Sequence, residues 1–421
     1  ISNCTSNGRL IGRNSFVGGF VGYISNSARM NMIVSKYVNN AIISGSEVGG
    51  FIGFVNSSTN ISIAITDSKN YGAIHGDCGG FVGSSSSNID MTITISNCSH
   101  NAVIYGTKYG GGFVGLTYNN TLMTLTIFNS ISSAKATGRA GHQGLIIGYI
   151  LNNKNMYITI SNSVVNDIYG DTGNGGFVGE IYGNVNINMS ISNSVNNGQV
   201  RWTYAGGFIR DIESNRNMIL TISNSTNNGR MAGCKSVGGF VGRLIGRSGM
   251  NTTISNCINN GRIISECSYV GGFIGYVSTT DMAISNSVNN GTVSGEDAGG
   301  FVGIIPSNTS MTISNCTNKA SVFGSYNISG LIGYISPYLP QDIILVGVIN
   351  SANKGNITAT AGMACGFTCV NPEKNTIGMT MIKNSINKGS VNAHTSAYGI
   401  TNNITVARNV VSMGDVTGSS G

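Results

Sequence analysis

The stretch ISNSVNNGTVSGEDAGGFVG, Ile284–Gly303, recurs in recognisable form along the whole chain of 421 residues. It joins a branched residue followed by Ser-Asn, an Asn-Asn-Gly turn, and the word Gly-Gly-Phe-Val-Gly. An aromatic or aliphatic residue takes the place of Phe301 in thirteen copies, which are spaced 28 to 36 residues apart with a period near 31. Repetition at this period is typical of proteins built from stacked structural units.

Within each copy the local pattern is that of β-strands. The segment MTITISN, Met91–Asn97, alternates apolar and polar residues with a period of two. GTVSG and GGFVGYI are short runs of strand-forming residues bounded by Gly or Asn. No segment sustains the 3.6-residue period of a helix, so each copy is predicted to contain three short strands separated by turns.

Strands this short cannot bury a hydrophobic face alone, so equivalent strands of consecutive copies must stack about 4.8 Å apart in parallel sheets. The predicted fold is therefore all-β: one continuous, single-domain parallel β-helix, or β-solenoid, of about 13 coils over residues 1–421. The residues at the Phe301 position would form a ladder along the core. This predicted core ladder consists of Phe20, Phe51, Phe81, Phe113, Leu145, Phe177, Phe208, Phe240, Phe273, Phe301, Leu331 and Phe367.

Asparagine recurs at two further positions of the copy. Asn289, in the Asn-Asn-Gly turn, has equivalents in most copies, and stacked amides at such a turn can hydrogen-bond to one another. Asn286, in the Ile-Ser-Asn word, is predicted to lie in a second, internal ladder. The segment between Gly-Gly-Phe-Val-Gly and Ile-Ser-Asn varies in length and is predicted to form an outer edge loop in each coil.

These words resemble the GLUG motif, a glycine-rich repeat of large secreted or surface-attached proteins. GGFVG at Gly238–Gly242, preceded by ISNSTNNGRMAG at Ile222–Gly233, follows the word order of that motif, and the resemblance extends from residue 1 to about residue 399. The chain favours Phe where the family name has Leu, and it is richer in Asn. The resemblance implies an extracellular or cell-surface location in an adhesin-like protein, and it supplies no catalytic residues.

Composition limits the classes of partner. Charged residues make up only 9 % of the chain, and the net charge of +7 comes from scattered Lys and Arg. Nucleic-acid binding requires basic residues clustered on one face, so no nucleic-acid partner is predicted. No apolar run approaches the roughly 18 residues of a membrane span, and none is predicted in this chain, which we interpret as a fragment of a longer or processed polypeptide.

The nine cysteines fall into different classes. Cys4, Cys98, Cys257 and Cys316 take the place of the Ser that follows the Ile-Ser-Asn word, and they are predicted to be small buried residues. Cys234 and Cys267 each precede a Phe anchor by six residues in adjacent copies, which makes a disulfide between them a candidate. A zinc site is disfavoured because no Cys-x-x-Cys pair with a His partner is present.

Asn-x-Ser/Thr triplets are frequent, and those in the variable edge segments are the candidate N-glycosylation sites of a secreted protein. These candidates are Asn56, Asn60, Asn119, Asn251 and Asn308. Asn3, Asn97, Asn224 and Asn315 also begin such triplets. Because they belong to the predicted internal ladder, they are expected to be poor acceptors.

No grouping of residues predicts an active site. The four histidines lie in different registers of the repeat, and no Asp/Glu pair is predicted on a strand face. Glu47 and Asp77 share a register in adjacent copies, where they could hold calcium or simply be solvated turn residues. The chain is therefore predicted not to be an enzyme and to need no cofactor or metal.

The leading functional hypothesis is a structural or adhesive extracellular glycoprotein, a repeat protein that forms a rod, stalk or filament on or outside the cell. Its predicted partners are other copies of itself, joined end to end or laterally, and host or surface glycans. The alternative hypothesis is a carbohydrate-binding or carbohydrate-cleaving β-helix protein.

Overall fold

The computed structural model describes residues 2–13, 15–138, 141–166, 174–265, 267–279, 281–337, 342–370, 377–402 and 406–418. The chain divides into two compact units, Ile1–Trp202 with Phe208–Ile219, and Thr203–Gly207 with Leu220–Gly421. Strands make up all of the regular structure in the described ranges. These ranges contain no helix that is long and apolar enough to cross a membrane. The predicted all-β class is confirmed.

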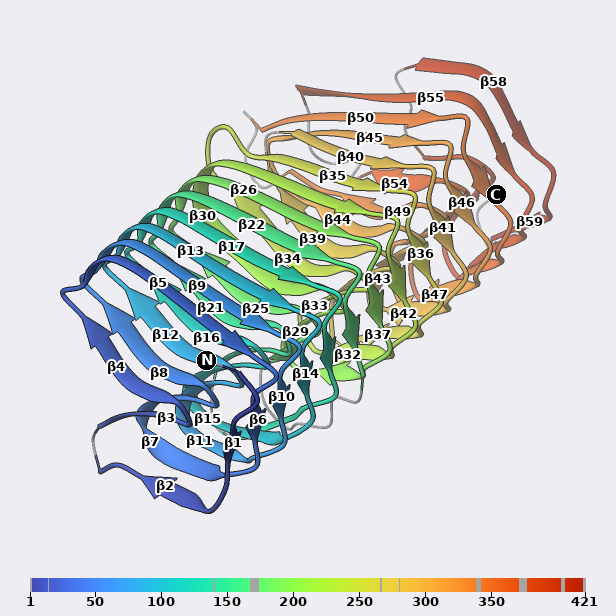
Figure 1. Ribbon diagram of the computed structural model, residues 1–421. Helices are drawn as coiled ribbons and strands as arrows, with labels where there is room; N and C mark the ends of the chain where they lie inside the picture. The colour runs from blue at the N-terminus through green and yellow to red at the C-terminus, as the bar shows by residue number, and fades with distance from the viewer. Residues whose placement is uncertain are drawn as a thin grey trace. The chain divides into compact units, whose positions relative to one another are not determined.

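Each unit is a β-solenoid, a stack of coils in which every strand pairs in parallel with the same strand of the next coil. A representative coil of the first unit contains β12 (Val82–Ser86), β13 (Ile89–Ser96), β14 (Ser99–His100) and β15 (Val103–Gly111). Strand β13 lies between β9 (Thr59–Thr66) and β17 (Thr121–Phe128), with Ile95 opposite both Ile65 and Ile127 (Figure 1). The repeat of about 31 residues gives about 12 turns in all, which confirms the predicted solenoid.

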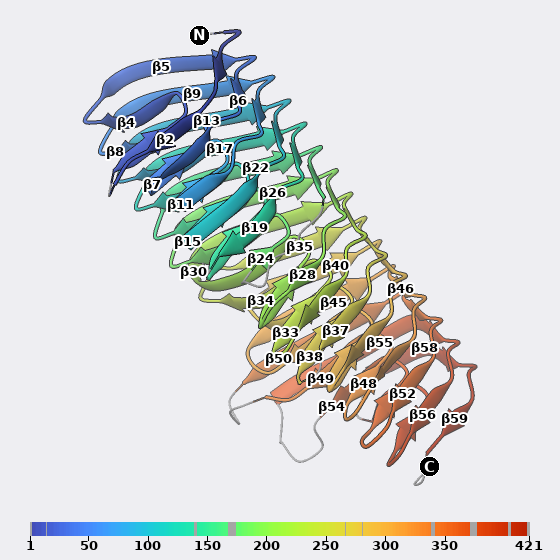
Figure 2. The same ribbon diagram turned by 90° about the horizontal axis from the view of Figure 1, so that it is seen from below.

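The other long strands of the first unit are stacked in the same manner, coil upon coil. The strands that follow the Phe anchor are β4 (Val21–Ser25), β8 (Ile52–Asn56), β16 (Val114–Tyr118), β21 (Ile147–Leu151), β25 (Val178–Tyr182) and the part of β30 (Ile209–Ser223) up to Ile219. The strands that lead into Ile-Ser-Asn are β5 (Ala28–Ser35), β22 (Lys154–Ser161) and β26 (Val185–Ser192). The strands that precede the anchor are β3 (Phe16–Gly18), β7 (Ile42–Gly49), β11 (Ile74–Gly79), β15, β20 (His142–Gly144) and β24 (Asn174–Gly175). Strands β7, β11 and β15 of this set lie side by side in Figure 2.

The second unit repeats this arrangement. After the anchor come β34 (Val241–Gly246), β39 (Ile274–Ser278), β44 (Val302–Ile305), β49 (Ile332–Ile335) and β54 (Thr368–Val370). The strands into or through Ile-Ser-Asn are β35 (Asn251–Ser255), β40 (Asp281–Ser285), β45 (Thr309–Ser314), β50 (Ile343–Ile349), β55 (Ile377–Asn387) and β58 (Val406–Ser412). Before the anchor lie β32 (Met231–Gly233), β33 (Ser236–Gly238), β37 (Ile263–Ser265), β38 (Tyr269–Gly271), β42 (Val293–Gly295) and β43 (Asp297–Gly299).

The aromatic anchors occupy the core of each unit. Phe81 stacks on Phe51 with ring centroids 4.4 Å apart and on Phe113 at 4.9 Å, and Phe273 stacks on Phe301 at 4.7 Å. Every residue of the ladder defined above is fully buried except Phe20, which is half-buried in the first coil. Stacked rings at these separations combine burial of apolar area with favourable ring geometry.

The double glycine before each anchor allows a close approach of the backbone. A Cβ on Gly80 would lie 1.9 Å from the carbonyl oxygen of Gly112, which real Cβ atoms do not tolerate. The same position in the next coil, Gly112, would meet the carbonyl oxygen of Leu145 at 1.8 Å. Gly is therefore required here by space between coils rather than by an unusual φ angle.

The asparagine of the Ile-Ser-Asn word is not internal, which corrects the prediction. Asn97 and Asn224 have φ angles of 53° and 49°, and they and their equivalents Asn3 and Asn315 are exposed. Each forms a left-handed corner, a conformation that Asn adopts more readily than other non-glycine residues. The side chains still bond along the surface, as Asn315 Nδ2 does to Asn286 Oδ1 at 3.2 Å.

The asparagines of the turn do form a buried ladder. In the second unit, Asn259 donates to Asn289 at 2.7 Å and Asn289 donates to Asn318 at 2.8 Å. The full ladder of that unit consists of Asn227, Asn259, Asn289, Asn318, Asn353 and Asn387. In the first unit, Asn39 donates to Asn70, but His100, Ser132 and Val165 follow in the same register.

The segment predicted to be a variable outer loop contains a further buried ladder in the first unit. Asn120 donates from Nδ2 to Asn153 Oδ1 at 3.0 Å, and Asn153 donates to Asn184 at 3.1 Å. The ladder runs through Asn88, Asn120, Asn153, Asn184 and Asn215. These amides also accept bonds from the backbone N–H groups of neighbouring coils, so this edge is ordered by buried side chains and is not a free loop.

Candidate functional site

Two rows of side chains face one another along the first unit. The first row comes from the strands that follow the anchor and the second from the strands that precede it. The first row consists of Tyr23, Phe54, Ser84, Leu116, Tyr149 and Glu180, in consecutive register. The second row consists of Phe16, Glu47, Asp77, Tyr109 and His142. We call them the facing rows.

Aromatic rings pack together at one end of the rows, and a carboxylate is bound in the next coil. Phe16 packs on Tyr23 at 4.7 Å and on Phe54 at 4.8 Å between ring centroids. One coil further, the Glu47 carboxylate accepts hydrogen bonds from the Ser84 hydroxyl and, at 2.6 Å, from the Tyr109 hydroxyl. Burial, and then the charge of Glu47, raise the pKa of Tyr109, so its phenol stays neutral and remains a donor.

Asp77 is largely buried beside Glu47. Its Oδ1 accepts bonds from the Thr107 hydroxyl and, at 2.7 Å, from the backbone N–H of Lys108. The Lys108 ammonium lies 3.7 Å from Asp77 Oδ2 and is otherwise exposed. Glu47 and Asp77 are paired in register, as the sequence indicated, but their oxygens are bound by hydroxyl and N–H donors.

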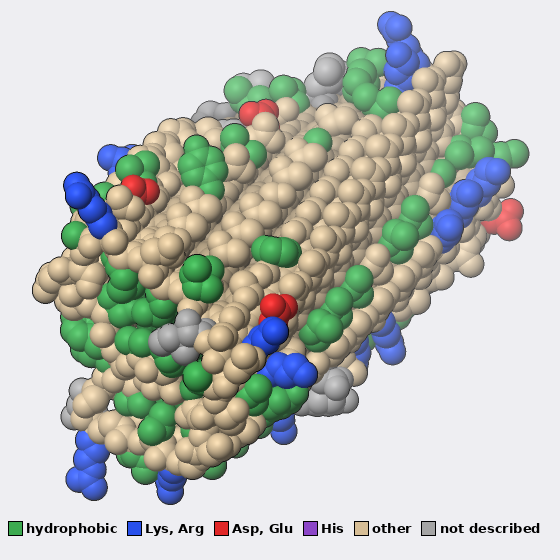
Figure 3. Space-filling model, in the orientation of Figure 1, with side chains coloured by type: hydrophobic (Ala, Val, Ile, Leu, Met, Phe, Trp, Pro, Cys, Tyr) green, Lys and Arg blue, Asp and Glu red, His purple; other side chains and the backbone are tan. Residues whose placement is uncertain are grey.

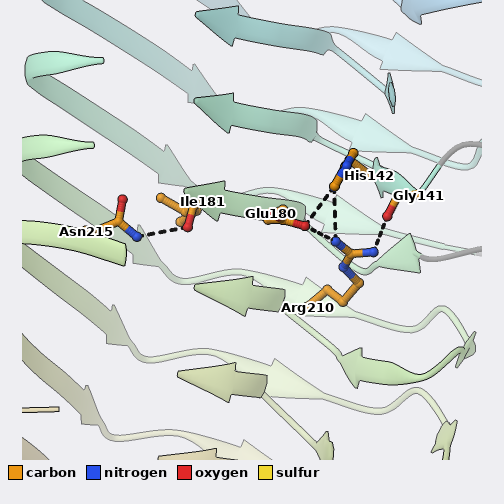
Figure 4. Close-up of polar contacts among 6 residues, drawn as sticks. All are labelled: Gly141, His142, Glu180, Ile181, Arg210 and Asn215. Atoms are coloured by element: carbon orange, nitrogen blue, oxygen red, sulfur yellow. Dashed lines mark hydrogen bonds and ion pairs between the residues drawn. The ribbon is translucent and has the colours of Figure 1, made fainter. Parts of the chain in front are cut away.

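The other end of the rows contains a buried ion pair, shown in Figure 4. The Arg210 guanidinium contacts the Glu180 carboxylate, and it also donates to the carbonyl oxygen of Gly141. His142 Nδ1 lies 2.7 Å from Glu180 Oε2 and 3.3 Å from Arg210 Nη2. Glu180 and Arg210 are 8 % and 5 % exposed, so their charges are compensated by each other rather than by water.

The contact with Glu180 fixes the state of the His142 ring. An ionised carboxylate can only accept hydrogen bonds, so Nδ1 must carry the proton that points at Glu180. The other nitrogen, Nε2, is then an acceptor in the neutral ring and a donor in the charged ring. The ring also stacks on Tyr149 at 4.3 Å with an interplanar angle of 11°, and these contacts hold it in one orientation.

His142 and Tyr149 line a pocket of about 440 Å³. We call it the His142 pocket; its lining consists of Lys108, Tyr109, Leu116, Gly141, His142, Tyr149 and Leu151. Burial, and then the charge of Glu180, raise the pKa of Tyr149, so this phenol is neutral. The pocket therefore combines leucine and ring surfaces with a few placed polar groups, as small-molecule sites do.

A second hollow of about 500 Å³ lies over β7, β11 and β15. His75 stacks on Tyr105 at 4.2 Å along its wall, and glycines 45, 76 and 106 form its floor. Burial, and then the charge of Arg9, lower the pKa of His75. Neither hollow has a carboxylate among its described lining residues, but the His142 pocket has the larger share of apolar surface.

The predicted Cys234–Cys267 disulfide is not formed: both cysteines are free thiols, and both are exposed. The pairing of Gly233 with Ser265 has an offset of 32 residues, whereas that of Ser236 with Tyr269 has an offset of 33. The two cysteines therefore lie at a corner where one coil has an extra residue and the side chains are not held in register.

A disulfide joins Cys365 and Cys369 instead. Both cysteines are fully buried and flank Phe367 within one coil. Cys98, Cys257 and Cys316 are buried free thiols that donate to backbone carbonyl groups, and burial raises the pKa of Cys98 to about 12. These thiols occupy the position that Ser130 has in another coil, and Cys98 N–H bonds to Ser130 Oγ.

The candidate glycosylation sites lie at the edge of the coils. Asn60, Asn119, Asn251 and Asn308 are exposed, and Asn56 is half-buried with its Nδ2 3.4 Å from the Tyr23 hydroxyl. Asn308 Oδ1 accepts a bond from the backbone N–H of Ile343. In the described part of the chain, no group of three or more His, Cys, Asp or Glu lies close enough together to hold a metal ion.

Sequence reasoning missed the cluster of His142, Glu180 and Arg210. It also missed that Glu180 and Asp211 are paired in register on adjacent strands, contrary to the expectation of no acidic pair on a strand face. A signal was present, because each acidic residue follows its Phe anchor by three positions, at Phe177 and Phe208. Counting from the anchor in every copy would have placed the two together.

Neither a family model nor a curated protein matches this chain.

Proposed function

We propose that this chain is a structural or adhesive protein of the cell exterior, in which the solenoid serves as a rod, stalk or filament. The observation that carries this proposal is the continuity of the ladders. In each unit the same side chains bond or stack from coil to coil, as in Phe240–Phe273–Phe301 and Asn259–Asn289–Asn318. Most of the repeated residues in this fold therefore serve to stack one coil on the next along the solenoid axis.

An oxidising location is supported by two further features. The Cys365–Cys369 disulfide is of a kind that persists outside the reducing cytosol. Four of the five candidate glycosylation sites are exposed. On the face displayed in Figure 3, charged side chains are few, and most of the surface is backbone or side chains that are neither charged nor hydrophobic, which suits a surface lined by amides and hydroxyls.

Self-association is supported by exposed apolar side chains on inner strands. Ile89 in β13 and Leu122 in the adjacent β17 are 51 % and 50 % exposed, and Ile343 and Leu345 in β50 are 50 % and 43 % exposed. Exposed apolar side chains that lie close together mark protein–protein interaction surfaces. We propose that copies of the chain associate, laterally through such side chains or end to end.

Electron microscopy and sedimentation of the purified chain, over a range of concentrations, test this proposal. We expect filaments or concentration-dependent oligomers, and we expect an Ile343→Lys/Leu345→Lys variant to form fewer. Ile131→Lys, which places the same charge on a single exposed residue of another strand, is the control. Dispersed monomers at every concentration would contradict the filament proposal.

The second candidate function is carbohydrate binding. It is favoured by one observation, the His142 pocket, with its stacked rings, leucines and oriented histidine. A glycan array combined with lyase and hydrolase assays distinguishes the classes. Turnover that disappears in a Glu180→Gln variant would identify an enzyme and overturn the proposal of a non-catalytic protein.

A further inference from the structure

We propose that the His142 pocket binds one pyranose unit of a neutral glycan. This inference rests on the second candidate function and is independent of self-association. It names a site and a ligand class.

The first argument is the chemistry of the pocket wall. A pyranose ring has an apolar face of C–H groups and an edge of hydroxyls. Leu116, Leu151 and the stacked pair of His142 and Tyr149 supply the apolar surface for that face. His142 Nε2 and the ammonium of Lys108 supply hydrogen-bonding groups for the edge, and the volume of about 440 Å³ is in the range of small-ligand sites.

The second argument is that the polar groups are already oriented. His142 is held by Glu180 and by its stacking on Tyr149, and Glu180 is held by Arg210. A binding group that is fixed before the ligand arrives loses little conformational entropy on binding. A buried Glu–Arg pair is costly to desolvate and adds little net stability, which points to a positioning role for the pair.

The third argument concerns charge. Among the described residues, the charged groups at or beside the pocket are the cations Lys108 and Arg210 and the carboxylates of Glu47, Asp77, Glu180 and Asp211, so two positive charges face four negative ones when His142 is neutral. Each cation is also in contact with a carboxylate. An anionic sugar would meet a net negative site, so a neutral glycan is favoured.

The fourth argument is the state of the backbone beside the pocket, in β16, β21 and β25. The backbone N–H and C=O groups of these strands are used in parallel pairing between coils. An extended peptide would find no free backbone partners here, whereas a ligand recognised by side chains would.

Calorimetric titration with defined hexasaccharides tests the inference. The probes are neutral β-linked hexamers of glucose and of N-acetylglucosamine and, as the anionic comparison, a hexamer of galacturonic acid. We expect a neutral hexamer to bind, and Tyr149→Ala to weaken the binding about tenfold or more. Tyr157→Ala removes an exposed tyrosine that is outside the pocket lining and should leave the affinity unchanged.

Two further variants separate binding from folding. Leu151→Arg obstructs the pocket from a strand end and should abolish binding even if Tyr149→Ala fails to fold. His142→Gln, which keeps a polar side chain but loses the contact of Nδ1 with Glu180, should weaken binding while circular dichroism stays unchanged.

The outcomes of the test are distinct. Absence of binding by either neutral hexamer would overturn the inference, as would binding that survives both Tyr149→Ala and Leu151→Arg. Preferential binding of the galacturonate hexamer would overturn the choice of a neutral ligand. Filament formation is measured separately, so failure of binding would leave the structural proposal in place, and failure of assembly would leave the binding site in place.

Discussion

The two units solve the same problem, the satisfaction of buried polar groups, at different corners of the coil. In the second unit the turn ladder is unbroken from Asn227 to Asn387. In the first unit the turn position changes to His100, Ser132 and Val165, and His100 Nε2 and Ser132 Oγ are left buried without a partner. The edge ladder from Asn88 to Asn215 passes through these same coils.

The comparison shows which side chain an axial ladder needs. A primary amide both donates and accepts along the stacking direction, so it can bond to an identical residue above and below. An imidazole or a hydroxyl group at the same position cannot, at the spacing of the coils, both donate to the amide of one neighbouring coil and accept from the amide of the other. A coil can therefore lose the amide at one corner when another corner keeps a continuous row.

The largest effect on stability is expected in the aromatic ladder, which both units contain. Phe177→Ala in the first unit and Phe273→Ala in the second should each lower the free energy of unfolding by about 3–5 kcal/mol, because each leaves a core cavity. Denaturant unfolding measures both. Phe323→Ala, at an exposed position, is the control and should change stability by less than about 1 kcal/mol. A large difference between the two core variants would show that the units do not share one packing scheme.

The next effect tests the two amide ladders directly. Asn153→Ala in the first unit and Asn289→Ala in the second should each cost about 2–4 kcal/mol, since each leaves buried amide groups of the adjacent coils without a partner. Asn188→Ala removes an exposed amide of the first unit and should be nearly neutral. If Asn153→Ala were as mild as Asn188→Ala, the edge ladder would not compensate for the interrupted turn ladder.

His100 makes the interrupted ladder sensitive to pH. Burial lowers its pKa from 6.5 to about 3, and its Nδ1 accepts a bond from Asn70 Nδ2 at 2.9 Å. Between these pKa values only the unfolded chain takes up the proton, so this group favours unfolding as the pH falls from 6.5 toward 3, with a slope of up to about 1.4 kcal/mol per pH unit. Above pH 6.5 the effect vanishes.

Unfolding measured at pH 7 and pH 5 tests this expectation. His100→Asn, which restores the amide, should be more stable than the native chain at pH 5 and should show a smaller loss of stability between the two values. An unchanged pH dependence in this variant would mean that His100 is not the titrating group.

The smallest effect on stability is expected at the position after Ile-Ser-Asn, where both units have a buried Ser or Cys. Cys98→Ser and Cys257→Ser should change the free energy of unfolding by less than about 1 kcal/mol, because the hydroxyl can make the bonds to the backbone that each thiol makes. Both thiols have pKa values raised by burial to about 12, so neither should react with iodoacetamide in the folded chain. Rapid modification of either thiol would contradict its burial.

The sequence predicts the solenoid well because its period is written thirteen times. The Phe301 position and the Asn289 turn are set by stacking of like residues, which a single sequence reveals directly. The edge ladder was missed because Asn153 lies in the segment whose length varies most, and variation was interpreted as exposure. Asn97 was placed inside because its recurrence was attributed to stacking, whereas a left-handed corner also demands Asn.

The candidate site was harder to predict because it is built from differences between copies. His142, Glu180 and Arg210 lie in three successive coils, and each is an exception to the residue that its position usually holds. Repeat analysis averages over such exceptions. Only the register of the strands, which brings residues about 30 positions apart into contact, shows that they meet.

The parallel in-register pairing of the coils has a consequence for how such a gene can change. Deleting one residue from Met91–Asn97 would turn every following side chain of that strand to the opposite face. Duplicating or removing one whole coil would keep Phe over Phe and Asn over Asn, because these ladders are built from contacts between adjacent coils. Unequal recombination between copies therefore gives chains of different length without redesign of the ladders, and the coil is the natural step by which this protein lengthens or shortens.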